Sequence, residues 1–548
     1  MASEVGPRTT RLRTTRRAHA WAPTHRPSVL AGDTTRMQTG KVYLVGAGPG
    51  DPELITVRGV ECLAEADVVL YDALAHPELL DYCRPDAERR FVGKRAGRAA
   101  ARQTAINEQL LEAARAGHVV VRLKGGDPYL FGRGSEEAEC LAAAGVRFEV
   151  VPGVPSPLAA TAYSGISLSH RDKASSIAYL TATESPEKAC SAHDFSKLAT
   201  ATQTLVIFMG LRKLRELMGV LMQHGRPGNC PAAVIQSASL PAQRIVVGTV
   251  ADIADRAEES GLGMPALTVV GDVVELRRYL RWYDNQPLFG KRVLVTRPRR
   301  QALGFVRALR RVGAAAVEFP AIRIAPMEDE QPLEQAVKRA GSYTWTAFTS
   351  VNGVERFFAV VKRLGLDARC LGGVQLAAIG TGTALALEQH GLKADLVPAE
   401  FRGEALAEAL LQHHGGRLDG VSVLLPRAEI ARNAVPDRLR ECGARVDVVP
   451  AYRTLSPTDE DARGLCAALS DGTVDIVTFT SPSTVRHTQQ ALGAQAIDLL
   501  RKVVVASIGP VTSAEAQRLG IAVDVTADTY TIAGLVDALA HHFEEQHP

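Results

Sequence analysis

Apolar runs of strand length alternate with segments of helical spacing along most of the chain. Residues 41–45 and 118–123 are short, mainly apolar runs closely followed by glycines, as expected of buried strands. Between them, residues 103–116 place apolar side chains at helical spacing, and Gly117 ends that segment. Strands that alternate with helices across short loops predict an α/β layer fold, in which ligands bind beyond the carboxyl ends of the strands.

The stretch LKGGDPYLFGRG, residues 123–134, lies where a predicted strand gives way to a predicted helix. Four of its residues are glycine, which favours a loop whose backbone approaches a ligand closely; an ordinary structural loop is the alternative. A second glycine-rich loop, residues 46–51, follows the first strand. It is not a dinucleotide-binding fingerprint, because Asp51 stands at the third glycine position and Pro49 lacks an N–H donor.

The spacing of the predicted elements changes near residue 175 and again near residue 283. Five strand-like runs and a helix between residues 177 and 270 predict a second α/β lobe, with a site between the two lobes. Residues 282–291 contain proline, glycine, asparagine and aromatic residues without any period, which indicates a linker. The predicted divisions are a disordered basic extension at 1–39, a first domain at 40–283, a linker at 284–290 and a second domain at 291–548.

The second domain contains an internal repeat. FTSVNGV at 348–354 recurs as FTSPSTV at 479–485, and IGTGT at 379–383 recurs as IGPVT at 508–512. We therefore expect two similar α/β lobes, because a repeated pair commonly builds a cleft between its halves.

Composition narrows the function classes. The chain of 548 residues is 46% hydrophobic and 22% charged, which is typical of globular proteins. Its eight cysteines and 14 histidines show no metal-ligand spacing, so we expect reduced thiols and no protein-bound metal. No apolar run reaches the roughly 18 residues that span a bilayer, so we do not expect an integral membrane protein.

The net charge of +3 is unevenly distributed along the chain. Residues 1–36 contain seven arginines and two acidic residues, so the remainder is close to neutral and offers no bulk field for nucleic acid. This arginine-rich start has no apolar period and is predicted to be disordered. An organelle transit peptide and a non-native upstream extension are both open interpretations of it.

Several motifs of the first domain agree in order and spacing with one family. They include VGAGPGDPELIT at 45–56, ADVVLYDAL at 66–74, VGKRAG at 92–97, VRLKGGDPYLFGRG at 121–134 and AYSGISLSHRD at 162–172. Through them the first domain resembles uroporphyrinogen-III C-methyltransferase, of the tetrapyrrole methylase family. The second domain resembles uroporphyrinogen-III synthase through shorter motifs, namely VLVTRP, AFTSVNGV, IGTGTA, LLPRAE, AYRT, FTSPSTV and IGPVTS.

The first resemblance implies that S-adenosyl-L-methionine is the cofactor, held largely through close backbone contacts. Two places depart from the family pattern: Pro155-Ser156 replaces the usual Thr-Ala or Thr-Ser, and Thr181-Ala182-Thr183 replaces Thr-Gly-His. The implied cofactor-binding residues are Pro49, Gly125, Gly126, Asp127, Leu130, Pro155, Ser156, Met209 and Ala238.

The same resemblance implies that Asp72 is a proton acceptor and Lys94 a proton donor. Methylation of a pyrrole carbon requires an electron-rich ring, an in-line methyl donor and final removal of a proton, so a base at a strand end fits the reaction. The alternative is that Asp72 caps the next segment and Lys94 is a solvated surface cation. Arg95, Arg133 and Arg171 are candidates for binding the substrate's carboxylates, with plain surface arginines as the alternative.

The second resemblance implies closure of linear hydroxymethylbilane with inversion of ring D and loss of water. Tyr452 is the best candidate for assisting departure of the hydroxyl group. Ser350, Thr383, Ser481 and Thr512 are candidates for binding the substrate, because hydroxyls and N–H groups at helix starts suit carboxylates. Helix caps and turn residues are the alternative interpretation of these serines and threonines.

The leading hypothesis is a cytoplasmic bifunctional enzyme that makes uroporphyrinogen III and methylates it at C2 and C7 to precorrin-2, at the start of the cobalamin and siroheme branch. The expected partners are tetrapyrrole substrates and a second copy of the chain, in a homodimer through the first domain, with no nucleic acid and no membrane. Two alternatives stay open: a methylase for another tetrapyrrole, for RNA or for diphthine, and a second domain that binds ligand without catalysis.

Overall fold

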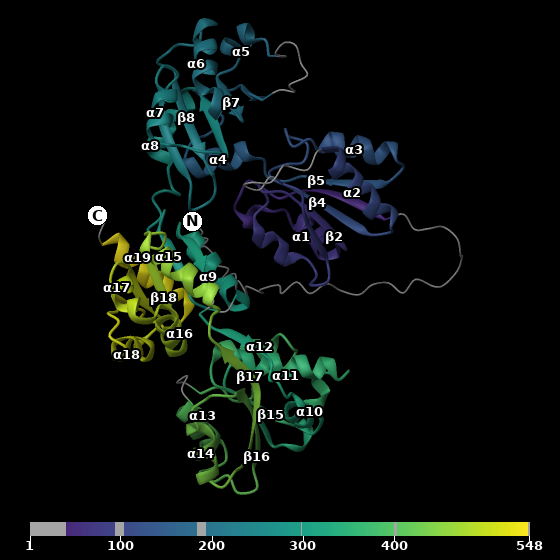
Figure 1. Cartoon of the computed structure of the whole chain (residues 1–548), viewed down its shortest axis with the longest axis vertical. Coiled ribbons are helices and arrows are strands. Elements are labelled where there is room, and N and C mark those ends of the chain that lie inside the picture. Colours follow the sequence, from purple (N-terminus) through teal and green to yellow (C-terminus); the bar gives the residue numbers. More distant parts are fainter. Residues whose placement is uncertain are drawn as a thin grey trace, which may run out of the picture.

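The computed structural model describes residues 40–93, 103–183, 193–297, 299–319, 321–398 and 403–545. It contains four five-stranded sheets, two in the first half of the chain and two in the second, with helices between the strands (Figure 1). The predicted α/β fold, with two lobes in each half, is confirmed. The predicted site residues Lys94 and Arg95, and the basic extension at 1–39, lie outside the described residues. Among the described residues, no helix combines the length and apolar character that crossing a membrane requires.

The first lobe is a parallel sheet with both faces buried. Its elements are β1 (Lys41–Gly46), α1 (Val57–Glu65), β2 (Val68–Tyr71), β3 (Glu88–Phe91), α2 (Gln103–Arg115), β4 (Val119–Lys124), α3 (Gly134–Ala143) and β5 (Arg147–Val151). The strand order is β3-β2-β4-β1-β5. In β1, Val42 and Leu44 pack into one apolar cluster, whereas Tyr43 and Val45 pack into another. Burial on both faces explains why these strands are continuous apolar runs rather than alternating ones.

The second lobe is a mixed sheet, drawn at the top of Figure 1. Its elements are α4 (Ser156–Ser164), β6 (Ile177–Thr181), α5 (Phe195–Ala201), β7 (Thr204–Phe208), α6 (Leu214–Gln223), β8 (Pro231–Gln236), β9 (Arg244–Thr249), α7 (Ile253–Glu259), β10 (Ala266–Val270) and α8 (Arg277–Leu280). The strand order is β6-β7-β10-β8-β9, in which β6 and β7 pair in parallel and the other neighbours are antiparallel.

The second half folds into a terminal lobe, built from both ends of that half, and an inserted lobe that lies between them in sequence. The terminal lobe contains β11 (Arg292–Val295), α9 (Arg299–Arg311), β12 (Ala315–Glu318), α15 (Asp459–Ser470), β18 (Ile476–Phe479), α16 (Pro482–Leu492), α17 (Ala496–Leu500), β19 (Val504–Ser507), α18 (Pro510–Arg518), β20 (Val525–Thr526) and α19 (Ile532–Glu544). The inserted lobe contains β13 (Arg323–Ala325), α10 (Gln331–Lys338), β14 (Trp345–Phe348), α11 (Val351–Arg363), β15 (Gln375–Ala378), α12 (Thr381–Glu388), α13 (Gly403–His413), β16 (Ser422–Ala428), α14 (Ala434–Glu441) and β17 (Arg445–Leu455).

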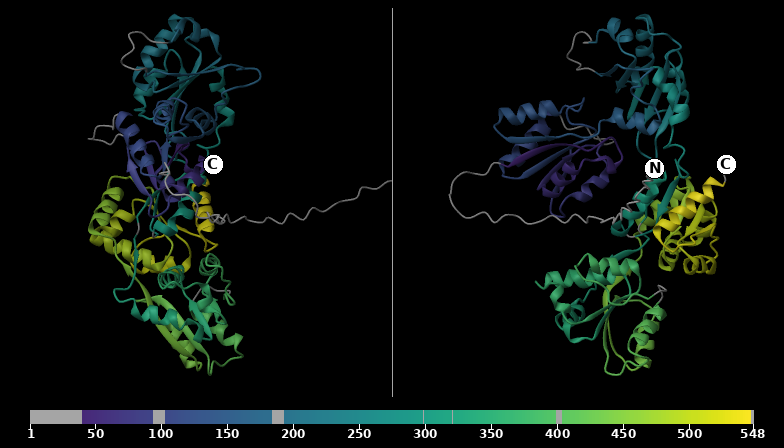
Figure 2. Two further views of the ribbon diagram at one scale, coloured as in Figure 1. Left: turned by 90° about the vertical axis from the view of Figure 1, so that its right-hand side faces the viewer. Right: turned by 180° about the vertical axis from the view of Figure 1, so that it is seen from behind.

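These two lobes are not the successive halves of the internal repeat. The strand order is β12-β11-β18-β19-β20 in the terminal lobe and β13-β17-β16-β14-β15 in the inserted lobe. When the two orders are aligned, β12, β11, β18 and β19 of the terminal lobe correspond to β17, β16, β14 and β15 of the inserted lobe. Each lobe therefore takes two of these strands from one repeat and two from the other. Figure 2 shows the consequence, since teal and yellow segments share the terminal lobe.

Candidate active sites in the two halves

The loops after β1, β4 and β5 meet at the carboxyl edge of the first sheet. The N–H of Gly126 donates to the carbonyl of Gly48 at 2.7 Å, and the N–H of Gly48 donates to the carbonyl of Gly126 at 3.3 Å. Gly46 and Gly153 approach so closely that a Cβ on Gly46 would lie 2.5 Å from the Cα of Gly153. A side chain at either position would push the loops apart. We call these three loops, residues 46–51, 125–127 and 153–156, the glycine floor.

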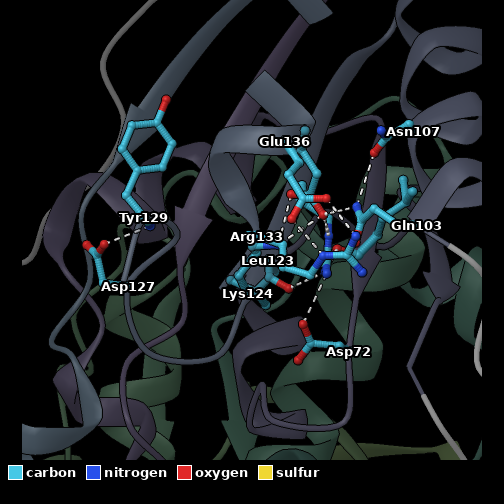
Figure 3. A network of polar contacts seen from close by, with 12 residues as sticks. Asp72, Gln103, Asn107, Leu123, Lys124, Asp127, Tyr129, Arg133 and Glu136 are labelled. Atoms are coloured by element: carbon cyan, nitrogen blue, oxygen red, sulfur yellow. Dashed lines mark hydrogen bonds and ion pairs between the residues drawn. The ribbon is translucent and has the colours of Figure 1, made fainter. Parts of the chain in front are cut away.

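Asp127 ties the glycine floor together with its carboxylate. Its Oδ1 accepts from the N–H of Tyr129 at 2.8 Å, and its Oδ2 accepts from the N–H of Gly153, on the next loop, at 3.1 Å (Figure 3 shows the Tyr129 contact). The carboxylate is therefore used within the floor, which leaves the backbone to face a ligand. A Cβ on Gly126 would lie 3.8 Å from the nitrogen of Ser156, so the predicted residues of the two loops are neighbours.

Residues of the second lobe approach the same loops. A Cβ on Gly50, next to Pro49, would lie 3.0 Å from the carbonyl oxygen of Ala238. Leu130 and Ala238 pack against the same apolar cluster on the second sheet. Met209, directly after β7, has a left-handed backbone (φ 53°) and is 50% exposed. A strained and exposed methionine marks a candidate ligand position, because such conformations cluster at functional sites.

A buried polar network lies near the carboxyl end of β4 (Figure 3). Arg122 Nη2 lies 3.1 Å from Asp72 Oδ2, and Arg122 Nε lies 3.2 Å from Glu137 Oε1. Lys124 Nζ lies 2.9 Å from both carboxylate oxygens of Glu137. Glu137 is fully buried and both cations are almost so, so two cations and two carboxylates balance inside the protein.

Asp72 has both a capping contact and an ionic one. Its Oδ1 accepts from the N–H of Leu74 at 3.0 Å, which is the predicted alternative, while its Oδ2 faces Arg122. Burial, followed by the nearby Arg122 charge, lowers the pKa of Lys124. Sequence reasoning missed Arg122 and Glu137 as partners of Asp72. For Arg122 the available signal was a pair of cations, Arg122 and Lys124, at the end of the apolar strand VVVRLK.

The predicted carboxylate-binding arginines of the first half differ in setting. Arg133 forms a two-pronged pair with Glu136, with contacts of 2.9 and 2.6 Å, beside the polar network (Figure 3). Arg171 is exposed in the turn that the His170 and Ala174 backbones close. Arg133 therefore has a partner that a substrate carboxylate would have to displace, whereas Arg171 faces solvent.

In the inserted lobe the structure brings two predicted residues into contact. Tyr452, on β17, and Ser350, at the start of α11, have hydroxyl oxygens 3.0 Å apart. The Ser350 oxygen also accepts from the N–H of Gly353 at 3.1 Å, so it caps α11 while it contacts Tyr452. Tyr452 is 6% exposed. The structure therefore places two hydrogen-bonded hydroxyls where β17 meets the start of α11.

The other predicted hydroxyls of the second half also lie at helix starts. Ser481, the equivalent of Ser350 in the terminal lobe, caps α16 by accepting from the N–H of Thr484 at 3.3 Å. Thr383 and Thr512 are buried in the first turns of α12 and α18. The structure therefore places these residues in two separate lobes, at equivalent positions.

A cavity of about 1160 Å³ lies between the two lobes of the second half. None of the predicted hydroxyl residues is in its described lining. The charged residues there are four acids and two arginines, namely Glu318, Glu355, Glu460, Asp461, Arg323 and Arg356. Val351 and Asn352, which directly follow Ser350, are part of the lining. The described part of this lining carries more carboxylates than guanidinium groups, so a polycarboxylate would need further cations beyond these residues.

Two arginines that sequence reasoning missed lie at equivalent strand ends of the two lobes. Arg297 follows β11, and Arg427 lies near the end of β16. These strand ends border the points where the strand order reverses, which is where α/β sheets bind ligands. Burial lowers the pKa of both guanidinium groups. The signal was an arginine at the end of each equivalent strand, in VLVTR and VLLPR.

The hydrogen bonding of these two arginines leaves capacity for a ligand. Within the described residues, Arg297 makes no hydrogen bond or ion pair. Arg427 donates to the carbonyl of Arg432 at 2.8 Å and to Asn433 Oδ1 at 2.6 Å, and its buried Nε has no partner in the described part of the chain. Arg427 is buried and Arg297 is partly buried. A guanidinium group withdrawn from water without a carboxylate is costly, which favours an anionic ligand at both places.

Comparison with known proteins assigns a family to each half. Residues 41–254 match the family described as Tetrapyrrole (Corrin/Porphyrin) Methylases, and residues 304–537 match Uroporphyrinogen-III synthase HemD. The chain is 37% identical over 506 residues to the Porphyrin biosynthesis protein HemD of Ruminiclostridium josui, covering 92% of this chain and 98% of that protein. It is 38% identical over 355 residues to the Uroporphyrinogen-III C-methyltransferase of Bacillus subtilis (strain 168), covering 65% of this chain and 72% of that one.

One solved structure similar to the first half is that of uroporphyrin-III C-methyltransferase from Thermus thermophilus complexed with S-adenyl homocysteine. It is 40% identical, covers 43% of this chain and 100% of its own, and gives a TM-score of 0.38. The two family matches follow each other in the order that the motifs predict, and the Ruminiclostridium josui relative spans nearly the whole chain. The chain therefore belongs to the family of porphyrin biosynthesis proteins in which a tetrapyrrole methylase is joined to a uroporphyrinogen-III synthase.

Proposed function

We propose that this chain is a bifunctional enzyme whose second half cyclises hydroxymethylbilane to uroporphyrinogen III and whose first half methylates that product at C2 and C7, giving precorrin-2. The observation that carries the proposal is that each of the two family matches in this chain contains its own polar site. These sites are the Asp72–Arg122 pair in the first half and the Tyr452–Ser350 pair in the second. The product of one reaction is the substrate of the other, which gives the fusion a chemical reason.

The methylase family implies a methyl donor of the S-adenosylmethionine type. The residues present fit such a donor, because the glycine floor offers backbone at close range and Leu130, Met209 and Ala238 add apolar surface. We assign S-adenosyl-L-methionine itself, which supplies an electrophilic methyl group when bound. The residues proposed to hold it are Pro49, Gly125, Gly126, Asp127, Leu130, Pro155, Ser156, Met209 and Ala238.

Asp72 is the proposed base of the methyl transfer. A pyrrole carbon that gains a methyl group must lose a proton, and the Asp72 carboxylate accepts it. Arg122 holds the carboxylate in one direction through the 3.1 Å contact. Lys94 remains the proposed proton donor, and Arg95, Arg133 and Arg171 the proposed carboxylate-binding residues.

Tyr452 is the proposed acid of the cyclisation. Loss of the bilane hydroxyl as water requires a proton at its oxygen, and the Tyr452 phenol donates it as the C–O bond breaks. Ser350 orients the phenol through the 3.0 Å contact. We propose that Arg297 and Arg427 hold substrate carboxylates together with the hydroxyls of Ser350, Thr383, Ser481 and Thr512, because guanidinium groups pair with carboxylates in two-pronged geometry.

The remaining proposals concern the domain boundaries, the oligomeric state, the location and the partners of the chain. We propose the domain boundaries 40–283, 284–290 and 291–548, a homodimer through the first domain and a cytoplasmic location. We propose no nucleic-acid partner, because the chain after residue 36 is close to neutral.

One incubation tests both activities. The protein is supplied with hydroxymethylbilane, with and without S-adenosylmethionine, and the porphyrinogen isomer and its methyl count are identified after oxidation. We expect the type III isomer without the donor and two added methyl groups with it. Type I isomer alone would mean a second half that binds without catalysing. Type III isomer that stays unmethylated would mean that the first half acts on another substrate.

A further inference from the structure

Helix α9 of the second half docks against the first lobe of the methylase half. Arg310 forms an ion pair with Glu78, and its Nη1 lies 3.9 Å from Asp51 Oδ1. Arg307 donates to the phenol of Tyr82 at 3.0 Å. Arg310 is 8% exposed, so its charge is buried between the two halves. The methylase half and the synthase half therefore share one buried cation.

Asp51, whose Oδ1 lies 3.9 Å from Arg310 Nη1 without a hydrogen bond between them, is the last residue of the first loop of the glycine floor. Its N–H donates to the hydroxyl of Ser239, in the second lobe, at 3.1 Å. Its Oδ2 accepts from the phenol of Tyr163, on α4, at 3.1 Å. Asp51 is 8% exposed. A single buried carboxylate thus connects the cofactor loop, both methylase lobes and the synthase helix.

Arg310 supplies the positive charge that balances the carboxylates of Asp51 and Glu78. Asp51 and Glu78 are both largely buried carboxylates, and Arg310 is the cation that contacts each of them. His76 faces the same charges, and burial lowers its pKa. Without Arg310, Asp51 would keep the hydrogen bonds from the N–H of Glu53 and the phenol of Tyr163, but Asp51 and Glu78 would both lose their shared positive charge, and like charges in a buried site repel. The loop ending at Asp51 would then have to move.

We propose that Arg310 is a positioning residue of the methyltransferase site, and that the synthase half completes this site from outside the methylase fold. Arg310 fixes Asp51, and Asp51 fixes the loop of Pro49 and Gly50 against Ala238. Docking of α9 is therefore part of the affinity for the methyl donor. This inference rests on the proposed function of the first half.

The test measures binding of S-adenosylhomocysteine to full-length variants by calorimetry. We expect Arg310→Met to raise the dissociation constant at least about tenfold, which corresponds to about 1.4 kcal/mol. The matched control is Arg311→Met, because Arg311 is the next residue of α9 and pairs with Glu53 across the same interface but has a 71% exposed side chain. We expect that control to stay within twofold, and Arg310→Lys to recover part of the loss. Cyclisation by every variant reports whether the second half is intact.

A second variant separates positioning from folding. In E78M/R310M both members of the ion pair are replaced by apolar side chains, which restores packing without an unpaired Glu78. We expect normal thermal stability but still weak binding, because Asp51 still lacks its cation. Wild-type affinity in either R310M or E78M/R310M would overturn the inference. Wild-type protein that does not bind S-adenosylhomocysteine at all would instead overturn the proposed cofactor.

Discussion

Asp72 faces the positive charge of Arg122, which is itself held by a second carboxylate, Glu137. Arg122 contacts Asp72 at 3.1 Å, and the fully buried Glu137 holds both Arg122 and Lys124. An unpaired charge inside a protein costs several kcal/mol, so the network favours the single arrangement in which each charge has a partner. The direction of the Asp72 carboxylate is therefore set by buried residues behind it.

Removing the charge of Asp72 tests its role as a base. Asp72→Asn keeps the size of the side chain, and we expect the turnover of methyl transfer to fall at least about 100-fold, in line with the contribution of general bases. Transfer of labelled methyl groups to uroporphyrinogen III measures it. Asp86→Asn is the control, because Asp86 also pairs with an arginine but has a 75% exposed side chain. A fall of less than fivefold in Asp72→Asn would leave this residue as a turn cap alone.

The phenol of Tyr452 is tested by removing one oxygen atom. We expect Tyr452→Phe to slow cyclisation about 100-fold, so that the bilane closes without enzyme to the type I isomer. Methylation of added uroporphyrinogen III should be unchanged. Tyr343→Phe is the matched control, since Tyr343 is equally buried in the same lobe and donates to Asp447 at 2.5 Å. Normal isomer III formation by Tyr452→Phe would contradict the assignment.

Elements differ in how far their sequence predicts them. The strands β1 and β4 and the glycine loops after them are local features, because a strand buried on both faces is a continuous apolar run. The Arg122–Asp72 contact joins residues 50 positions apart, and the contact between Arg292 and Asp475 spans 183. No local pattern reports such pairs. The internal repeat could be found in the sequence because its motifs are local. The exchange of strands between its lobes could not, because it depends on which distant strands pair.

The equivalent ends of β11 and β16 predict that both lobes bind substrate. We expect Arg297→Met and Arg427→Met each to raise the KM for hydroxymethylbilane about tenfold with a smaller change in kcat, because a lost charge-assisted contact costs about 1.5–3 kcal/mol. Initial-rate assays at low and high salt measure the effect. Arg501→Met is the control, since its side chain is 72% exposed in the terminal lobe. An unchanged KM in both strand-end variants would place the substrate elsewhere.

At the scale of the whole molecule, the exchanged strands make the terminal lobe depend on both ends of the second half. Leu294 of β11 and Phe479 of β18 belong to one apolar cluster. Beside them, Thr296 donates to the carbonyl of Thr478, 182 positions along the chain. Phe348 of β14 occupies the matching place in the inserted lobe, in a cluster with Leu424 of β16. Both phenylalanines are fully buried.

Because β11 and β12 share a sheet with β18 and β19, one substitution should affect strands from both repeats. Two repeats that each folded as a separate lobe would not behave in this way. Phe479→Ala should destabilise the terminal lobe by about 3–5 kcal/mol. Hydrogen exchange should then rise in β18 and also in β11 and β12, far earlier in the chain, while β14 and β15 keep their protection. Phe348→Ala should do the reverse, exposing β14, β16 and β17 and sparing β11. Exchange that instead rose together in β11, β12, β14 and β15 after either substitution would mean that each repeat folds as its own lobe.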